Sequence, residues 1–399
     1  MSDVSAQYEA YPYPERDPRD ELKRLITGSP SHPLEIDHFV FGGKRDWRKP
    51  LRALVAGGGT GDGLIQLAQI LKSAGRPFEI TYLDMSRSAR AVAEERAALR
   101  ELEGIEFVTG SLLSAPDLGR FDYIDCCGVL HHLGDPQAGF DALARALTPA
   151  GGLGFMVYAP YGRSGVYPLQ EAFGELLAGF SPQEKLARAR EVFARLPAGH
   201  PFRCNPHLND HNVSDAGFYD LLLHAQDRPF AVGDLWDSLT AAGLELSSFT
   251  QPALYDPAEF LGEMEGPHNE RARMELAEKL RGTIRMHVGY AVGQGRGARA
   301  VAGGPDAALV PHLKGVGARA LADQLARKGQ LRLTLGAGKI TLKLPRAAAP
   351  LVALIDGRRT LAQIAREAGL DGLAFNALWT PTGRALSGYG LLLYSRLLV

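Results

Sequence analysis

Residues 54–63 carry the sequence LVAGGGTGDG, the segment with the clearest potential for ligand chemistry. Glycines at alternate positions 57, 59 and 61 allow a tight turn and a close approach of main chain to a ligand, because no Cβ is in the way. A turn between a strand and a helix needs glycine in any case, so the spacing is more informative than the glycines themselves. The dinucleotide fingerprint requires a glycine where Asp62 stands, and an NAD site is therefore disfavoured.

Asp84 follows the glycine-rich turn by about 20 residues, at the end of the next apolar segment. In a doubly wound sheet, a carboxylate at this place accepts hydrogen bonds from two neighbouring ribose hydroxyls and so recognises a nucleoside. The alternative is a structural role as a helix N-cap, since Ser86 and Ser88 follow. Further along, Gly110 and Ser111 form a turn that can present an N–H and a hydroxyl to an adenine edge.

His131 and His132 are the best candidates for a general base, because the unperturbed pKa of histidine lies near neutrality. The alternative is that the pair only shapes its loop and packs against a cofactor. Tyr158 and Tyr161 follow the next apolar segment, where aromatic rings can enclose a cation or a substrate ring. We predict that these four residues lie at the reaction centre.

Two further pairs of side chains are candidates for substrate contacts. Tyr11 and Tyr13 belong to a proline-containing N-terminal segment that we expect to cover the site as a lid. His207 and His211 have the i, i+4 spacing of a metal-binding helix face. A polar substrate wall is the favoured interpretation, and no metal site is predicted.

Alternating strand and helix segments must position these residues. Strands are predicted at 51–56, 79–83, 105–108, 123–126 and 153–158, and helices at 63–74, 89–102 and 137–147. This alternation predicts an α/β fold with a doubly wound, Rossmann-like sheet. Ligands bind at the carboxyl ends of the strands in such sheets, so the candidate residues are expected to converge there.

The rest of the chain departs from this alternation. Segments 244–250 and 284–292 are predicted strands that complete the sheet, and the stretches around them are insertions. A helix, a hairpin and three helical stretches after residue 305 predict a small, independent α+β, winged-helix-like domain. The expected organisation is an N-terminal arm or lid at 1–50, a ligand-binding core at 51–160, a helical substrate insertion at 161–233, completion of the sheet with a further insertion at 234–292, a linker at 293–304 and a C-terminal domain at 305–399.

Four ordered motifs between residues 50 and 160 resemble the class I S-adenosylmethionine-dependent methyltransferase family. They are the glycine-rich turn, the acid that ends the second strand, Val-Leu-His-His-Leu at 129–133 and Pro-Ala-Gly-Gly at 149–152. Two positions depart from the family pattern: Ala56 stands where many members carry an acid or another polar group, and Ser111 where an aspartate is common. We therefore expect cofactor binding to use more main-chain contacts.

The resemblance implies S-adenosylmethionine as the cofactor and methyl transfer by in-line displacement, which requires an aligned acceptor above all. The cofactor contacts are predicted at Ala56, Gly57, Gly59, Gly61, Asp84, Met85, Gly110, Ser111, Leu112, Gly128 and Val129.

The acceptor is predicted to be a protein side chain or a small metabolite. No Asn-Pro-Pro-Tyr-like tetrapeptide follows the fourth strand and the net charge is −1, so no nucleic-acid partner is expected. Downstream, residues 220–224 and a helix–Gly–strand unit at 235–249 resemble bacterial protein-lysine methyltransferases with a regulatory region. The alternative is a catalytically silent, methyltransferase-like interaction module.

Composition predicts a soluble, cytoplasmic protein of more than one domain. The chain has 399 residues, and it lacks any stretch of the roughly 20 apolar residues that a membrane span needs. The three cysteines, Cys126, Cys127 and Cys204, are few and odd in number, which suits a reducing compartment, and they form neither a disulfide scaffold nor a zinc pattern. The oligomeric state is left open.

Overall fold

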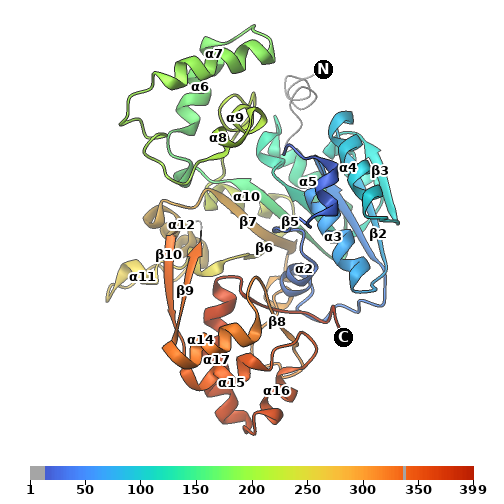
Figure 1. Ribbon diagram of the computed structural model, residues 1–399, viewed down its shortest axis with the longest axis vertical. Helices are drawn as coiled ribbons and strands as arrows, with labels where there is room; N and C mark the ends of the chain where they lie inside the picture. Colours follow the sequence, from blue (N-terminus) through green and yellow to red (C-terminus); the bar gives the residue numbers. More distant parts are fainter. Residues whose placement is uncertain (1–13, 336–337) are drawn as a thin grey trace.

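A seven-stranded sheet forms the centre of the molecule (Figure 1). The computed structural model describes residues 14–335 and 338–399. The strands lie in the order β3-β2-β1-β4-β5-β7-β6, and all run parallel except β7. Their bounds are Leu51–Ala56 (β1), Phe78–Asp84 (β2), Ile105–Thr109 (β3), Phe121–Cys127 (β4), Leu147–Tyr158 (β5), Leu244–Phe249 (β6) and Met286–Gly293 (β7). The Rossmann-like sheet predicted from the sequence is confirmed.

Helices cover both faces of this sheet. One face packs against α5 (Pro136–Ala146) and α10 (Val232–Ala241), and the other against α2 (Pro33–Val40), α3 (Asp62–Ser73) and α4 (Arg87–Leu99). Because the central strands are buried on both sides, they consist of nearly continuous apolar residues rather than of alternating polar and apolar ones.

The helix starts follow from local sequence. The Ser86 hydroxyl accepts the N–H of Ala89 at 3.1 Å and caps α4. Gly61 adopts a left-handed conformation with φ of 99° directly before α3. Pro33 occupies the first turn of α2, where its missing N–H costs nothing. Residues 33–40, which belong to the predicted N-terminal arm or lid, thus form a buried helix.

A helical insertion with its own apolar core separates β5 from α10. Its helices are α6 (Val166–Leu176), α7 (Pro182–Ala194), α8 (Asp210–Val213) and α9 (Asp215–Leu222). The chain rejoins the sheet at Phe230, whose N–H donates to the Tyr158 carbonyl at 2.8 Å. In Figure 1 this insertion (green) and the C-terminal region (orange to red) lie at opposite ends of the molecule.

A second insertion, between β6 and β7, contains α11 (Ala258–Leu261) and α12 (Glu270–Arg281), and α12 packs beside α10. Within the described ranges, no helix has both the length and the apolar character that crossing a bilayer requires.

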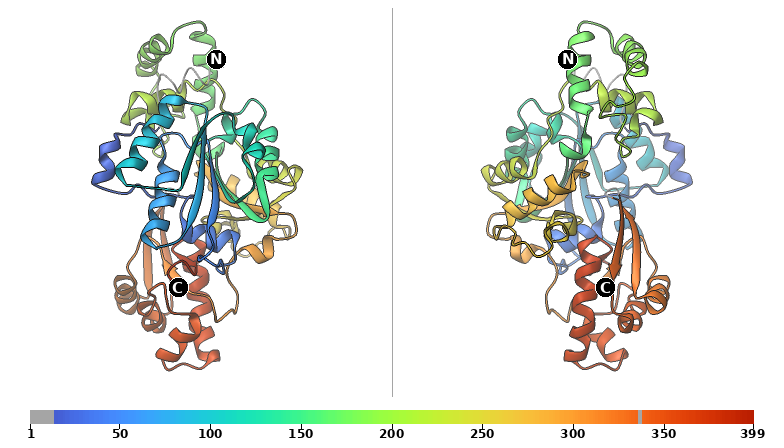
Figure 2. Two further views of the ribbon diagram at one scale, coloured as in Figure 1. Left: turned by 90° about the vertical axis from the view of Figure 1, so that its right-hand side faces the viewer. Right: turned by 90° about the vertical axis from the view of Figure 1, so that its left-hand side faces the viewer.

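The C-terminal region combines helices with two pairs of strands. The elements are β8 (Pro311–Leu313), α14 (Ala318–Lys328), β9 (Gln330–Leu335), β10 (Gly338–Lys343), α15 (Ala349–Ala353), α16 (Leu361–Glu367), α17 (Gly372–Gly388) and β11 (Leu392–Tyr394). Strands β9 and β10 form the hairpin, which extends from this region towards the sheet (Figure 2), and β8 pairs with β11. A winged-helix-like arrangement of these elements stays a prediction.

The C-terminal region is not packed as an independent body. Leu393 and Leu397 belong to the apolar core beneath the sheet, together with α2. The Asp37 carboxylate in α2 accepts the Ser395 hydroxyl at 2.7 Å and the Arg396 N–H at 2.9 Å. The segment predicted as a linker contains α13 (Gly297–Ala300), which is also packed against this core. The boundaries of the predicted domains themselves stay predictions.

Candidate active site

A cavity of about 370 Å³ lies at the carboxyl ends of β1, β2, β4 and β5. Every predicted cofactor contact except Gly61 lines it: Ala56, Gly57, Gly59, Asp84, Met85, Gly110, Ser111, Leu112, Gly128 and Val129. Gly61 instead serves the packing of α3 on α4, since a Cβ there would lie 3.0 Å from the Ala93 Cβ.

The turn after β1 requires glycine at position 57. Gly57 has a φ of 71°, and a Cβ there would lie 2.3 Å from Val129 Cγ2. The main chain therefore passes directly beneath the floor of the cavity at a place where no side chain fits.

The Asp84 carboxylate is held against this turn. Its Oδ2 accepts the N–H of Gly59 at 2.8 Å, and its Oδ1 accepts the N–H of Ser86 at 2.8 Å. The N-cap of α4 is Ser86. Asp84 therefore does not have the N-cap role that was the structural alternative for it. The carboxylate lies at the cavity wall, between the turn and the Gly110–Ser111 segment.

The described part of the N-terminal segment closes one side of the cavity with Pro14, Ile26 and Ser29. It is fastened by ion pairs from Arg16 to Asp62 at 2.6 Å and from Glu21 to Arg96 at 2.6 Å, the latter buried. A lid function of this segment stays a prediction. The predicted substrate contacts Tyr11 and Tyr13 lie outside the described residues.

The opposite end of the cavity carries polar groups that include two of the four predicted catalytic residues, Tyr158 and His132. The Nδ1 of His132 lies 2.8 Å from the Gln226 carbonyl oxygen and so donates its proton there. Burial lowers the pKa of His132 to about 3. The ring is therefore neutral and a weak proton acceptor at neutral pH.

The other two predicted catalytic residues do not reach the cavity. His131 is fully buried behind the wall, with its ring centroid 4.1 Å from that of Tyr158. Burial lowers its pKa, and neither ring nitrogen has a hydrogen-bond partner among the described residues. Tyr161 is 39% exposed and lies outside the lining.

Asp220, from α9 of the insertion, lines the cavity beside Tyr158 and was not identified from the sequence. The Tyr158 hydroxyl donates to its Oδ2 at 3.3 Å. Burial raises the pKa of Asp220 to about 7. In the sequence, Asp220 is only a single acid in front of the apolar run Leu221–Leu223. Its position beside Tyr158 of β5 follows from the fold.

Arg163 supplies the positive charge behind this end of the cavity. Its guanidinium carbon lies 3.5 Å from the centroid of the Tyr158 ring, and its Nη2 lies 3.3 Å from Asp227 Oδ2. Both side chains of this ion pair are buried. Tyr158 is thus held between a cation at its face and a carboxyl at its hydroxyl.

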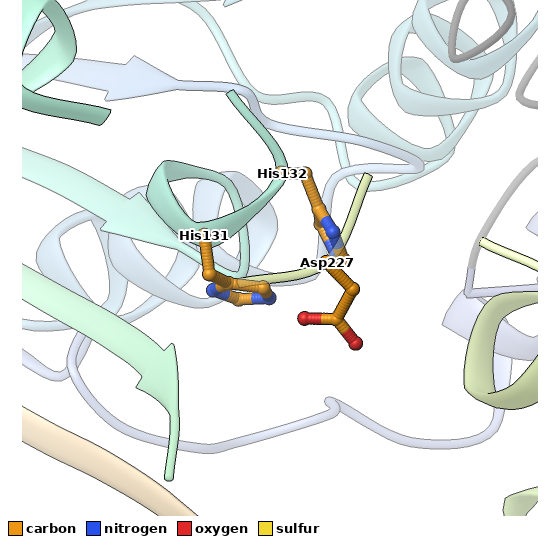
Figure 3. A group of neighbouring side chains, drawn as sticks. All are labelled: His131, His132 and Asp227. Atoms are coloured by element: carbon orange, nitrogen blue, oxygen red, sulfur yellow. The ribbon is translucent and has the colours of Figure 1, made fainter. Parts of the chain in front are cut away.

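Two groups of potential metal ligands occur here in the described chain, His131–His132–Asp227 (Figure 3) and His132–Asp220–His224, each with donor atoms within 4.8 Å. The His132 and His224 rings stack with centroids 3.6 Å apart and planes 17° apart. In nearly parallel rings the nitrogen lone pairs run side by side and do not converge. In the first group Asp227 already has Arg163 as its cation. The absence of a metal site stays a prediction.

The predicted substrate contacts His207 and His211 do not line the cavity. His211 packs between Phe193 and Phe202 in the core of the insertion, with ring centroids 5.3 and 4.9 Å away. His207 accepts a hydrogen bond from Arg285 through its main-chain carbonyl. Neither position supports the predicted substrate wall.

Asp125 in β4 is a second lining residue that the sequence did not reveal as functional. It is 2% exposed, and burial raises its pKa to about 6. The Ser31 hydroxyl donates to Oδ2, whereas Oδ1 has no hydrogen-bond partner among the described residues.

Comparisons with known proteins agree with this geometry. Residues 54–153 match the family model described as a methyltransferase domain. An uncharacterised protein of Synechococcus is 34% identical over 267 residues, which is 65% of this chain and 62% of that protein. A ubiquinone biosynthesis O-methyltransferase of Alkalilimnicola ehrlichii is 32% identical over 138 residues, 34% of this chain and 51% of that enzyme. The chain thus spans only about half to three-fifths of these curated relatives.

Among solved structures, PKMT2 from Rickettsia typhi in complex with AdoHcy superimposes with a TM-score of 0.64 at 14% identity. The superposition covers 94% of this chain and 76% of that one, so the similarity in fold extends beyond the sheet to the insertion and the C-terminal region. Residues 54–153 thus match a methyltransferase domain, and the strand order and this superposition show that the chain shares the Rossmann-like fold of PKMT2.

Proposed function

We propose that this protein is an S-adenosylmethionine-dependent methyltransferase that transfers the methyl group by in-line displacement to a protein side chain or a small metabolite. One observation carries the proposal. The Asp84 carboxylate lies at the Gly57–Gly59 turn, and a single cavity joins it to Tyr158 and Asp220. A fold alone does not establish an activity. The proposal therefore rests on the site, in which a proposed nucleoside-binding end and a polar end belong to the same cavity.

The residues present fit the proposed cofactor. We propose that Asp84 accepts hydrogen bonds from the ribose hydroxyls and that the adenine packs against Ser111 and Leu112, since all three residues line the cavity. Gly57 presents main chain to the cavity at a position where a Cβ would meet Val129. The cofactor contacts are therefore proposed as predicted, without Gly61.

The bound cofactor supplies a methyl group on a sulfonium, which needs no further activation. The protein must hold the acceptor in line, exclude water and take up a proton where the acceptor carries one. Tyr158 and Asp220 lie at the end of the cavity where these tasks arise. Arg163 packs on the Tyr158 ring, and the Tyr158 hydroxyl donates to Asp220. We propose no proton transfer to His131 or His132, because burial lowers the pKa of both.

The O-methyltransferase relative and the AdoHcy complex of PKMT2 support this assignment. An intact turn with its carboxylate favours an active enzyme over a silent interaction module. We also propose a cytoplasmic location, because the three cysteines are free thiols and suit a reducing compartment.

Calorimetric titration tests the cofactor assignment. We expect AdoHcy to bind and NADH not to bind. The Asp84→Asn variant should lose about 10- to 100-fold in AdoHcy affinity, the range of a hydrogen bond to a charged group. Unchanged affinity in this variant would remove Asp84 from the site. Absence of AdoHcy binding to the wild type would overturn the proposed function.

A further inference from the structure

Asp125 is a buried carboxylate with one oxygen unused. Its Oδ2 accepts the Ser31 hydroxyl, while its Oδ1 has no partner among the described residues although the side chain is 2% exposed. Burial raises its pKa to about 6, and no cation contributes to that value. Burying an acceptor without a donor costs free energy, so a fold keeps such a group where something else supplies the donor.

The surroundings of Asp125 leave room for that donor. The carboxylate lines the cavity at the carboxyl end of β4, next to Val55 of β1 in the sheet register. A Cβ at Gly63 would lie 2.5 Å from Asp125 Oδ2 and 2.6 Å from Ser31 Oγ. Gly63, in the first turn of α3, therefore leaves the space that the Ser31–Asp125 pair occupies, and a larger residue there would collide with this pair.

The nearby charged groups are already satisfied by one another. Asp62 is paired with Arg16 and with Arg96, and Arg96 is also paired with Glu21. The end of β1 offers only the apolar Ala56. Asp125 is thus the carboxylate that remains for a positively charged ligand group on this side of the Gly57–Gly59 turn, with Asp84 on the other side.

We propose that Asp125 Oδ1 receives the α-ammonium group of the amino-acid end of the adenosyl ligand. This assignment rests on the proposed function: Asp84 at the end of β2 would hold the ribose, and Asp125 of β4 would hold the amino-acid end of the same ligand. Two carboxylates on either side of β1 then hold the two ends of one molecule.

The test compares two ligands on three proteins at pH 7.5 by calorimetric titration. The ligands are AdoHcy and its analogue with hydrogen in place of the α-amino group. We expect the wild type to prefer AdoHcy by roughly 10- to 100-fold, the range of one charged hydrogen bond. In Asp125→Asn that preference should fall below about threefold through weaker AdoHcy binding. The amide oxygen can still accept the Ser31 hydroxyl, so the variant keeps this contact.

Asp84→Asn is the matched control, because it should weaken both ligands equally and leave the preference intact. A melting curve without ligand provides a second readout. The folded pKa of Asp125 lies above that of an unfolded aspartate, so the ionised group reduces stability at pH 7.5. Asp125→Asn should therefore melt at a higher temperature than the wild type.

Two results would overturn the inference while leaving the proposed function intact, provided that the wild type binds AdoHcy. One is an Asp125→Asn variant that keeps the full preference for AdoHcy. The other is a variant that melts below the wild type or fails to fold, since Asp125 would then be a structural carboxylate. A wild type that binds neither ligand would overturn both proposals.

Discussion

Asp220 and His132 line the same end of the cavity, yet burial shifts their pKa values in opposite directions. The pKa of Asp220 rises to about 7 and that of His132 falls to about 3, because both groups lose hydration of their charged forms. The carboxylate thereby becomes the stronger base of the two near neutrality. The histidine motif in the sequence leads to this end of the cavity, where His132 lies, but Asp220 is the group better suited to accept a proton there.

The rate of methyl transfer should therefore follow the ionisation of Asp220. Its pKa of about 7 predicts that the wild-type rate rises as the pH increases from 6 to 8, because only the carboxylate form accepts a proton. Asp220→Asn should lower the rate by about 100-fold or more and remove this rise. The measurement is methyl transfer from labelled S-adenosylmethionine to cell extract across this pH range.

Asp215→Asn is the control for the Asp220 prediction, since it lies on the same helix with a 63% exposed side chain. It should keep the wild-type rate and pH profile, and both variants should bind AdoHcy as the wild type does. An Asp220→Asn enzyme with an unchanged pH profile would exclude the proposed proton acceptor.

At the scale of elements, the sheet was predictable and the contacts between distant segments were not. Strands such as Leu51–Ala56 are buried on both faces, so their apolar composition alone located them. Helix α2 was not located within the N-terminal arm because Pro30 and Pro33 suggest an extended chain, although proline is well suited to a first helical turn. Asp125 and Asp220 acquire their neighbours only through tertiary contacts, with Ser31 and Tyr158 respectively, and no local pattern encodes these contacts.

The turn between β1 and α3 should tolerate no side chain at its first glycine. Gly57→Ala places a Cβ 2.3 Å from Val129 at a φ of 71°, so the turn must shift away from the ligand. We expect the variant to fold and to lose measurable AdoHcy binding by calorimetry. Gly75→Ala is the matched control, because Gly75 has a φ of 64° but no atom within 4 Å of the added Cβ. Its stability should fall while its AdoHcy affinity stays unchanged.

At the scale of the whole molecule, the last residues of the chain pack against α2, one of its first helices. After the separate apolar cluster of the C-terminal region, β11 and the residues that follow it bring Leu393 and Leu397 into the apolar core that contains α2. Arg76, next to β2, donates to the Leu397 carbonyl at 2.7 Å. The prediction of an independent domain at 305–399 did not include this packing of Leu393 and Leu397. Two leucines near the end of a sequence do not reveal which apolar core they belong to.

Leu393→Ala should consequently destabilise the sheet as well as the C-terminal region. Truncating a fully buried leucine costs about 2–5 kcal/mol, and Leu393 is 0% exposed. We expect one cooperative thermal transition, shifted down as a whole and still raised by AdoHcy. Leu373→Ala, at an 84% exposed position, should leave the transition in place. Two separate transitions, with the AdoHcy-sensitive one unshifted, would contradict a shared core.

Helix α2 and the residues just before it touch both ends of this molecule. Ser29 lines the cavity and also accepts a hydrogen bond at 3.1 Å from Lys314, which follows β8, while Lys314 is ion-paired with Glu35 of α2. The cavity wall and the C-terminal region are therefore connected through Ser29, Lys314 and Glu35. By thermodynamic reciprocity, if displacement of Lys314 changes the affinity of a ligand in the cavity, that ligand changes the free energy of the displacement by the same amount.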